Sequence, residues 1–181
     1  MAWVTHGSDI VYTNPWIEVR EDSITGPGGD GIYGVVTMRH PAVFVVALDD
    51  QERVCLVTLD RYTTGPSVEV PAGGSDGEPA LTAAQRELRE ETGYEASEWT
   101  ALGTMHALNG IADAAENVFL ARGIRATGSP ATSDAQAEEG IDAVTWIPFA
   151  DILRMISDGR ITDGETIAAI TYAGIRLGRF R

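Results

Sequence analysis

The sequence has few of the features that mark a secreted, membrane-spanning or disulfide-linked protein. It contains one cysteine, Cys55, which excludes an intramolecular disulfide and any metal site built from several thiolates. Its longest uninterrupted apolar run, residues 42–48, is far too short to span a bilayer. The first nine residues have neither a basic region nor an apolar core, so we expect no secretory signal. We therefore expect a protein of the reducing cytoplasm with no membrane partner.

Positive charge is also scarce. The 181 residues carry 27 Asp and Glu against 13 Lys and Arg, which gives a formal net charge of −14. A protein of this charge repels polyanions such as duplex DNA, and no cluster of basic residues offsets the repulsion. We therefore expect no nucleic-acid partner. An acidic protein can still bind phosphates where divalent cations mediate the contact.

The pattern of apolar and turn residues predicts many strands, one central helix, further strands and two final helices. Expected strands cover 9–13, 16–22, 32–38, 42–49, 53–60, 67–71, 99–108, 116–122 and 142–148, and expected helices cover 79–92, 149–157 and 163–177. Residues 126–140 are expected to form a long polar loop, and Thr162 and Glu165 have the spacing of a capping box. This order favours a mixed sheet flanked by helices. We expect residues 1–40 to form a small β extension and residues 41–181 the main domain.

The central helix carries three acidic residues within five positions. At 100° per residue, Leu81, Ala84 and Leu88 share one stripe, which we expect to be buried. The adjacent stripe holds the three carboxylates, Glu87, Glu90 and Glu91. Clustering like charges costs about a few tenths of a kcal/mol per pair. A hard divalent cation reverses this cost, because Mg²⁺ prefers oxygen ligands and commonly bridges carboxylates to phosphates.

Two interpretations of this helix are open, a solvated acidic face and a metal site. The preceding stretch, PAGGSDGE, favours the metal site, because glycine lets backbone groups approach a ligand closely and Glu78 adds a further acid. Arg86 is placed to brace one of the carboxylates.

The segment from Gly73 to Tyr94 resembles the Nudix box. The family pattern is glycine, five residues, glutamate, seven residues, Arg-Glu, an aliphatic residue, any residue, Glu-Glu, any residue, glycine and an apolar residue. The residues that match in register are Glu78, Arg86, Glu87, Leu88, Glu90, Glu91, Gly93 and Tyr94. One position departs from the pattern, since four residues rather than five separate Gly73 from Glu78. When the family pattern is aligned without a gap, the position of its first glycine is occupied by Ala72 in this chain.

The resemblance implies an α/β/α sandwich around a mixed sheet, and hydrolysis of a nucleoside diphosphate linked to another group X. It also implies Mg²⁺ or Mn²⁺ as the cofactor. By position, the metal ligands would be Glu87, Glu90, Glu91 and the carbonyl of Ala72. Arg86 and Glu78 would orient these ligands, and Glu91 and Arg86 would both take part in catalysis.

Nearly the whole chain is similar to the ADP-ribose and nucleoside-diphosphate-sugar pyrophosphatase branch of this family, in stretches such as NPWIEVRED, VEVPAGG and NVFLARG. This resemblance implies a small nucleotide substrate and a domain-swapped homodimer built with the N-terminal strands. It implies that Trp16, or less favourably Trp3, stacks on the base and that Arg61 lies near the phosphates. The alternatives are a tryptophan that packs the small sheet and an arginine in a surface ion pair.

In this branch a glutamate from a loop after the box helps to activate water. Glu138 and Glu139 lie at about that place, and Glu139 is the preferred base. Glu116 is a further candidate for binding metal or substrate. ADP-ribose enzymes usually carry a proline in the segment after the box, where this chain has Leu108 and Asn109. Another nucleoside diphosphate sugar, such as GDP-mannose, therefore stays open beside ADP-ribose.

Two rival functions are weighed against hydrolysis. A family member that resembles isopentenyl-diphosphate isomerase would need a catalytic cysteine, whereas Cys55 lies in an apolar run before the box. A non-catalytic binding or sensor module usually loses box glutamates or gains a DNA-binding domain. This chain keeps the glutamates and adds nothing basic.

Overall fold

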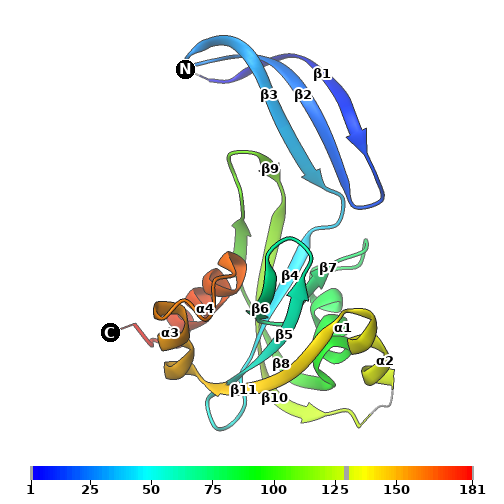
Figure 1. Ribbon diagram of the computed structural model, residues 1–181. Helices are drawn as coiled ribbons and strands as arrows, with labels where there is room; N and C mark the ends of the chain where they lie inside the picture. Colours follow the sequence, from blue (N-terminus) through cyan, green and yellow to red (C-terminus); the bar gives the residue numbers. More distant parts are fainter. Residues whose placement is uncertain (1, 129–130, 181) are drawn as a thin grey trace.

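The computed structural model describes residues 2–128 and 131–180 (Figure 1). Its strands are β1 (Val4–Thr13), β2 (Ile17–Gly26), β3 (Gly29–Met38), β4 (Ala42–Ala47), β5 (Arg53–Arg61), β6 (Gly65–Glu69), β7 (Ala72–Gly74), β8 (Tyr94–His106), β9 (Ala112–Asp113), β10 (Ala115–Ala126) and β11 (Ile141–Pro148). Its helices are α1 (Ala80–Thr92), α2 (Ala131–Glu138), α3 (Phe149–Ser157) and α4 (Gly164–Arg176).

The main body is a sandwich of helices around two sheets. One sheet has the strand order β7-β4-β10-β8, and the other has the order β11-β5-β6. Strands β4 and β10 pair in parallel, whereas the other pairs in these sheets are antiparallel. Helices α1 and α2 lie on one side of the strands, and α3 and α4 lie on the other (Figure 1). This arrangement confirms the expected α/β/α sandwich around a mixed sheet.

Strand β4 is buried on both faces because it lies between the two helical layers. Val45 and Ala47 belong to the apolar cluster that packs against α1, while Val46 and Leu48 belong to the cluster that packs against α3 and α4. Side chains alternate across a strand, so one strand contributes to both halves of the core. Cys55 is fully buried in the cluster on the α1 side, which confirms its expected place in a core strand.

Strands β1, β2 and β3 form an antiparallel sheet that stands away from the sandwich, at the top of Figure 1. The segment exposes large apolar side chains, among them Trp3, Ile10, Tyr12, Trp16 and Ile32. Strand β9 pairs in parallel with β3 and so connects this sheet to the sandwich. The expected boundary at residue 40 lies between β3 and β4 and stays a prediction.

The segment 126–140, expected to be a polar loop, instead contains α2. The α2 sequence has almost no apolar periodicity, so the pattern that reveals an amphipathic helix is missing. The helix makes its contacts chiefly with α1 and β11. Among the described residues, no helix is long and apolar enough to cross a membrane.

Two details of the expected helices are also wrong. Leu81, expected in the buried stripe of α1, is 41% exposed, because it lies in the first turn, where α1 is only partly covered. Ala83 is buried in its place. Asp163, rather than Thr162, caps α4, since its carboxylate accepts a hydrogen bond from the backbone N–H of Thr166 at 2.7 Å.

Leu88→Ala should destabilise the fold far more than Leu81→Ala, a matched substitution in the same helix. Leu88 is fully buried, whereas Leu81 is 41% exposed. Removing the buried side chain leaves a cavity and should cost about 2–5 kcal/mol of unfolding free energy, against less than about 1 kcal/mol at the exposed position. Chemical denaturation measures both losses. Equal losses would contradict the orientation of α1 described here.

Candidate active site

The site is built on α1 and the short strand β7 that precedes it. Gly93 ends the helix in a left-handed conformation with φ 75°, which glycine adopts without strain. Ala84 and Leu88 pack α1 against the sheet, and this packing turns two acidic side chains of the helix inward. Glu87 and Glu91 are 6% and 4% exposed, so both carboxyl groups have lost most of their contact with water.

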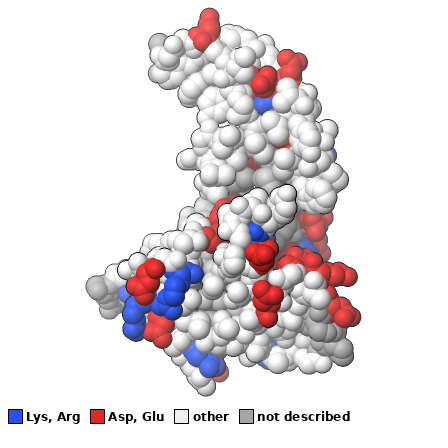
Figure 2. Space-filling model, viewed as in Figure 1, with Lys and Arg blue, Asp and Glu red and all other residues white. Residues whose placement is uncertain are grey.

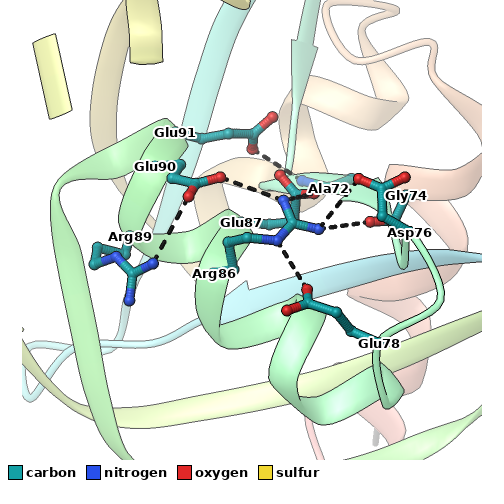
Figure 3. A network of polar contacts seen from close by, with 9 residues as sticks. All are labelled: Ala72, Gly74, Asp76, Glu78, Arg86, Glu87, Arg89, Glu90 and Glu91. Atoms are coloured by element: carbon teal, nitrogen blue, oxygen red, sulfur yellow. Dashed lines mark hydrogen bonds and ion pairs between the residues drawn. The ribbon is translucent and has the colours of Figure 1, made fainter. Parts of the chain in front are cut away.

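Arg86 holds the carboxylates together (Figure 3). Its Nε donates to Glu78 Oε2 at 2.9 Å, and its Nη1 donates to Glu87 Oε1 at 2.8 Å and to Glu90 Oε2 at 3.3 Å. Its Nη2 donates to the carbonyl of Gly74 at 2.8 Å. The prediction that Arg86 braces one carboxylate therefore understates its role, because one guanidinium donates hydrogen bonds to three carboxylates and the backbone of β7 and forms an ion pair with a fourth carboxylate, that of Asp76, at 3.8 Å.

Glu91 is held separately from this guanidinium. Its Oε2 accepts a hydrogen bond from the backbone N–H of Ala72 at 2.9 Å (Figure 3). The Glu91 carbonyl accepts a second hydrogen bond, at 2.7 Å, from the side chain of Gln136 in α2. Helix α2 is thus fastened to the end of α1 that carries the acidic residues.

Gly73 lets β7 approach the carboxylate of Glu87. A Cβ atom at position 73 would lie 2.2 Å from Glu87 Oε1, much closer than any real contact. The glycine of PAGG that matters most for this site is therefore Gly73, because only a residue without a side chain leaves room for the carboxylate.

Burial is the main influence on the pKa values of Glu87 and Glu91. It raises the pKa of Glu91 to about 8, and the hydrogen bond from Ala72 only partly opposes this effect. Burial also raises the pKa of Glu87, while the adjacent Arg86 lowers it. The charge of Glu87 contributes to the raised pKa of Glu91, and the charge of Glu139 contributes to the raised pKa of both groups. The carboxylates of Glu87 and Glu91 thus have too little positive charge nearby to compensate their own negative charge.

A cavity of about 420 Å³ opens beside these glutamates. Its walls include Trp16, His40, Arg61, Gly73, Glu87 and Glu139. Figure 2 shows acidic side chains gathered at the waist of the molecule, beneath the N-terminal sheet. The cavity therefore brings together an aromatic ring, an arginine and a group of carboxylates from segments far apart in the sequence.

The structure brings some of the predicted residues to this cavity and leaves others outside it. Trp16 and Arg61 both line it, as does Glu139, whereas Glu138 is not part of its lining. Glu116 lies outside the cavity walls. Trp3 packs edge-to-face on Tyr33, with ring centroids 5.6 Å apart, and does not line the cavity.

The donor set fits a hard divalent cation. Glu87, Glu90 and Glu91 have carboxylate oxygens and Ala72 has a backbone carbonyl, and these are the types of oxygen that Mg²⁺ and Mn²⁺ prefer as ligands. Among the described residues, no three acidic, histidine or cysteine side chains are gathered as a metal would hold them. In this conformation the guanidinium of Arg86 supplies the positive charge against two of the carboxylates.

The sequence patterns did not predict three residues of the site. Glu69, 5% exposed, holds Arg61 through two hydrogen bonds, at 3.0 Å from Nε and 2.6 Å from Nη2. The pair lies on adjacent antiparallel strands, but the register places Arg61 opposite Gly65 and Glu69 opposite Val57, so cross-strand pairing gave no signal for this contact. Gln136 gave no signal either, because it lies in the helix that the sequence does not reveal. Phe44 lines the cavity from β4, where it resembles any other core residue.

The family comparisons cover nearly the whole chain. A model described as the NUDIX domain matches residues 38–170. A model described as the nucleoside diphosphate sugar hydrolase N-terminal domain matches residues 3–36.

The chain is also similar to individual proteins. The chain is 35% identical over 174 residues to an ADP-ribose pyrophosphatase of Mycobacterium tuberculosis, which covers 94% of this chain and 80% of that protein. It is 31% identical over 119 residues to a GDP-mannose pyrophosphatase of Yersinia pestis, with 66% and 59% covered. A crystal structure of an ADP compounds hydrolase has a TM-score of 0.82 at 19% identity and covers 100% of this chain and 97% of that one. At this identity the last likeness shows the fold alone.

Glu91→Gln should stabilise the metal-free protein at high pH. Burial raises the folded-state pKa of Glu91 from 4.5 to about 8, so its contribution to stability is full below pH 4.5 and is lost as the pH rises toward 8. Glutamine keeps an oxygen for the Ala72 N–H but cannot ionise. With a chelator present, the variant should melt roughly 3–8 °C above the wild type at pH 8.5 and close to it at pH 5. A difference that is the same at both pH values would contradict this assignment.

Proposed function

Because this chain belongs to the Nudix family, we propose that it is a metal-dependent pyrophosphohydrolase of nucleoside diphosphate sugars. Its products would be a nucleoside monophosphate and a sugar phosphate. The observation that carries the proposal is the cluster of α1 carboxylates, with Glu87 and Glu91 buried and Arg86 bound to Glu87 and Glu90, at the edge of a cavity that also contains Arg61 and Trp16. ADP-ribose is the preferred substrate, and GDP-mannose is the alternative within the same reaction class.

The acidic stripe of α1 would hold Mg²⁺ or Mn²⁺ through Glu87, Glu90, Glu91 and the carbonyl of Ala72. A bound cation would offset the charge of the diphosphate and lower the pKa of a bound water. Arg86 keeps two of the carboxylates in place through its hydrogen bonds to them. Glu78 fixes the other side of the guanidinium. Such a site would explain how a protein of charge −14 could bind a polyanion.

Arg61 would contact the phosphates, and Trp16 would stack on the base. Glu69 supports the first role, because its two hydrogen bonds fix the guanidinium plane of Arg61 at the cavity wall. Trp16 is 67% exposed and lines the same cavity, so its ring is accessible to a ligand rather than packed in a core.

Glu139 would act as the general base. Its carboxylate would take a proton from the attacking water as the water oxygen bonds to one phosphorus and the bridging P–O bond breaks. The preference for Glu139 over Glu138 is supported by its place in the cavity wall beside Glu87. Cys55 does not support the isomerase function, since it is fully buried and burial raises the pKa of its thiol.

The protein would form a homodimer through its N-terminal sheet. Its exposed large apolar residues, such as Ile10, Val11 and Ile32, would lose contact with water in such an interface. Trp16 would then lie near the junction of the two subunits. We also propose a cytoplasmic location, on the ground that the one cysteine is buried and free.

The proposal is tested by product release with Mg²⁺ from a panel of substrates. The panel contains ADP-ribose, GDP-mannose, other nucleotide sugars, NADH, diadenosine polyphosphates and nucleoside triphosphates. The expected result is release of a nucleoside monophosphate from one nucleotide sugar, abolished by a chelator. A folded, metal-loaded protein that binds nucleotides but cleaves none of these compounds would contradict the proposal and favour a sensor module.

A matched pair of loop variants tests the base in the same assay. Glu139→Gln should lower kcat by roughly 10²–10⁴-fold, the usual contribution of a positioned general base. Glu138→Gln removes the same charge one residue away and should change kcat less than about threefold. Equal losses in the two variants would reject Glu139 as the base.

A further inference from the structure

A second cavity of about 450 Å³ adjoins the active-site cavity. Phe44 and Arg61 belong to the walls of both, so the two spaces meet at Arg61. The far wall of the second cavity is the N-terminus of α4, with Asp163, Gly164 and Glu165. A ligand whose phosphates contact Arg61 could therefore extend from the α1 carboxylates toward α4.

The second cavity differs in chemistry from the first. Glu69, Asp163 and Glu165 line it together with the hydroxyl residues Thr63, Thr64, Ser67 and Thr162. Its one arginine, Arg61, is already paired with Glu69. This wall repels a phosphate but suits a group with several hydrogen-bond donors. The first cavity also contains carboxylates, but Trp16, Met38 and His40 line it as well, and these side chains suit a base rather than a polyol.

Glu116 provides an independent observation behind this wall. It is 7% exposed, and its Oε2 has no hydrogen-bond partner among the described residues. Burial, together with the charges of Glu165 and Asp163, raises its pKa to about 7. A buried carboxyl oxygen without a partner is costly unless a ligand or water completes it.

A third, smaller cavity is lined by the strand neighbour of Glu116, although Glu116 itself is not part of its wall. Met105, the partner of Glu116 in the β10–β8 ladder, lines this space of about 360 Å³ with His106 and Leu108. Gly164 and Glu165 belong to its wall as well as to that of the second cavity. Glu165 therefore belongs to the walls of both spaces, and its charge acts on the buried carboxyl of Glu116.

We propose that Glu165, supported by Asp163 and Glu116, binds the hydroxyl groups of the sugar X, and that these carboxylates set the preference for a polyhydroxylated X. The substrate would then lie with its nucleoside toward Trp16, its diphosphate at Arg61 and its sugar against the N-terminus of α4. This inference rests on the proposed function and adds the direction in which the substrate lies. Carboxylates bind vicinal hydroxyls well because each oxygen accepts a donated hydrogen bond.

The test compares two substrates with a common nucleoside diphosphate. One is the nucleotide sugar that the wild type cleaves best, and the other is the ethyl ester of the same nucleoside diphosphate, which has no hydroxyl on X. The full chain is assayed with Mg²⁺ as the wild type, Glu165→Gln, Glu116→Gln and Glu98→Gln. Glu98 is an exposed residue of β8 outside all three cavities, so its variant is a control for the loss of one charge.

In Glu165→Gln, the ratio of kcat/KM for the sugar to kcat/KM for the ethyl ester should fall roughly tenfold to hundredfold, the effect of losing hydrogen bonds to a charged acceptor. The fall should be mainly in KM for the sugar. Glu116→Gln should lower the ratio in the same direction, and Glu98→Gln should leave it unchanged. Melting temperatures of the variants show whether a loss comes from misfolding.

Two results would overturn the inference. An unchanged ratio in Glu165→Gln, with the sugar still cleaved, would show that the sugar lies elsewhere and would leave the proposed function standing. An equal loss for both substrates would assign Glu165 a role at the diphosphate instead. Failure of the wild type to cleave any nucleotide sugar is a separate outcome, which rejects the proposed function and this inference together.

Discussion

The arrangement of the candidate active site depends on buried negative charge that lies beside a single guanidinium, that of Arg86. Glu87 and Glu91 are almost completely removed from water, which is unfavourable for two ionised carboxylates one helical turn apart. Arg86 compensates Glu87 directly, together with Glu90 and Glu78, but makes no hydrogen bond to Glu91. The helix therefore has an excess of negative charge, which a bound divalent cation would neutralise. The same cation would bind the phosphates of the ligand. We interpret the cost in the free protein as preparation of the site for that ligand.

Each neighbouring element helps to keep this charge in place. The fully buried Leu88 fixes the rotation of α1, which turns Glu87 and Glu91 inward. Gly73 lets β7 come close enough for its backbone to face them, and Ala72 donates to Glu91. Arg61 is held by Glu69 and lies in the walls of two cavities. The two cavities thus share Arg61, and Trp16 lines the first of them while the N-terminus of α4 lines the second.

The sequence predicts the parts of the site that depend on local spacing. The 100° rotation per residue is enough to place Glu87, Glu90 and Glu91 on one side of α1, and the structure keeps them there. Local spacing could not show that Leu81 is exposed, because this depends on where the sheet ends beneath the helix. It also could not show that Arg86 reaches Gly74, since that contact depends on the path of β7.

Contacts between distant segments were mostly beyond prediction. The polar segment that forms α2 has no apolar stripe, so neither the helix nor its hydrogen bond from Gln136 to α1 could be foreseen. The sequence alone gave only a slight preference between Glu138 and Glu139, and the turn after α2 places the second at the cavity. Glu116 was recognised as a candidate, but its unpaired oxygen and its proximity to Glu165 depend on how α4 packs against β10.

The most direct test of this account is a titration of the full chain with Mn²⁺, followed by electron paramagnetic resonance at pH 8, with and without a non-hydrolysable methylene analogue of the diphosphate substrate. The account predicts that the wild type binds Mn²⁺, that the analogue tightens binding, and that Glu87→Gln weakens it at least about tenfold while Glu98→Gln does not. Absence of Mn²⁺ binding to the wild type under both conditions, or equal binding by Glu87→Gln, would contradict the claim that the buried carboxylates form a cation site.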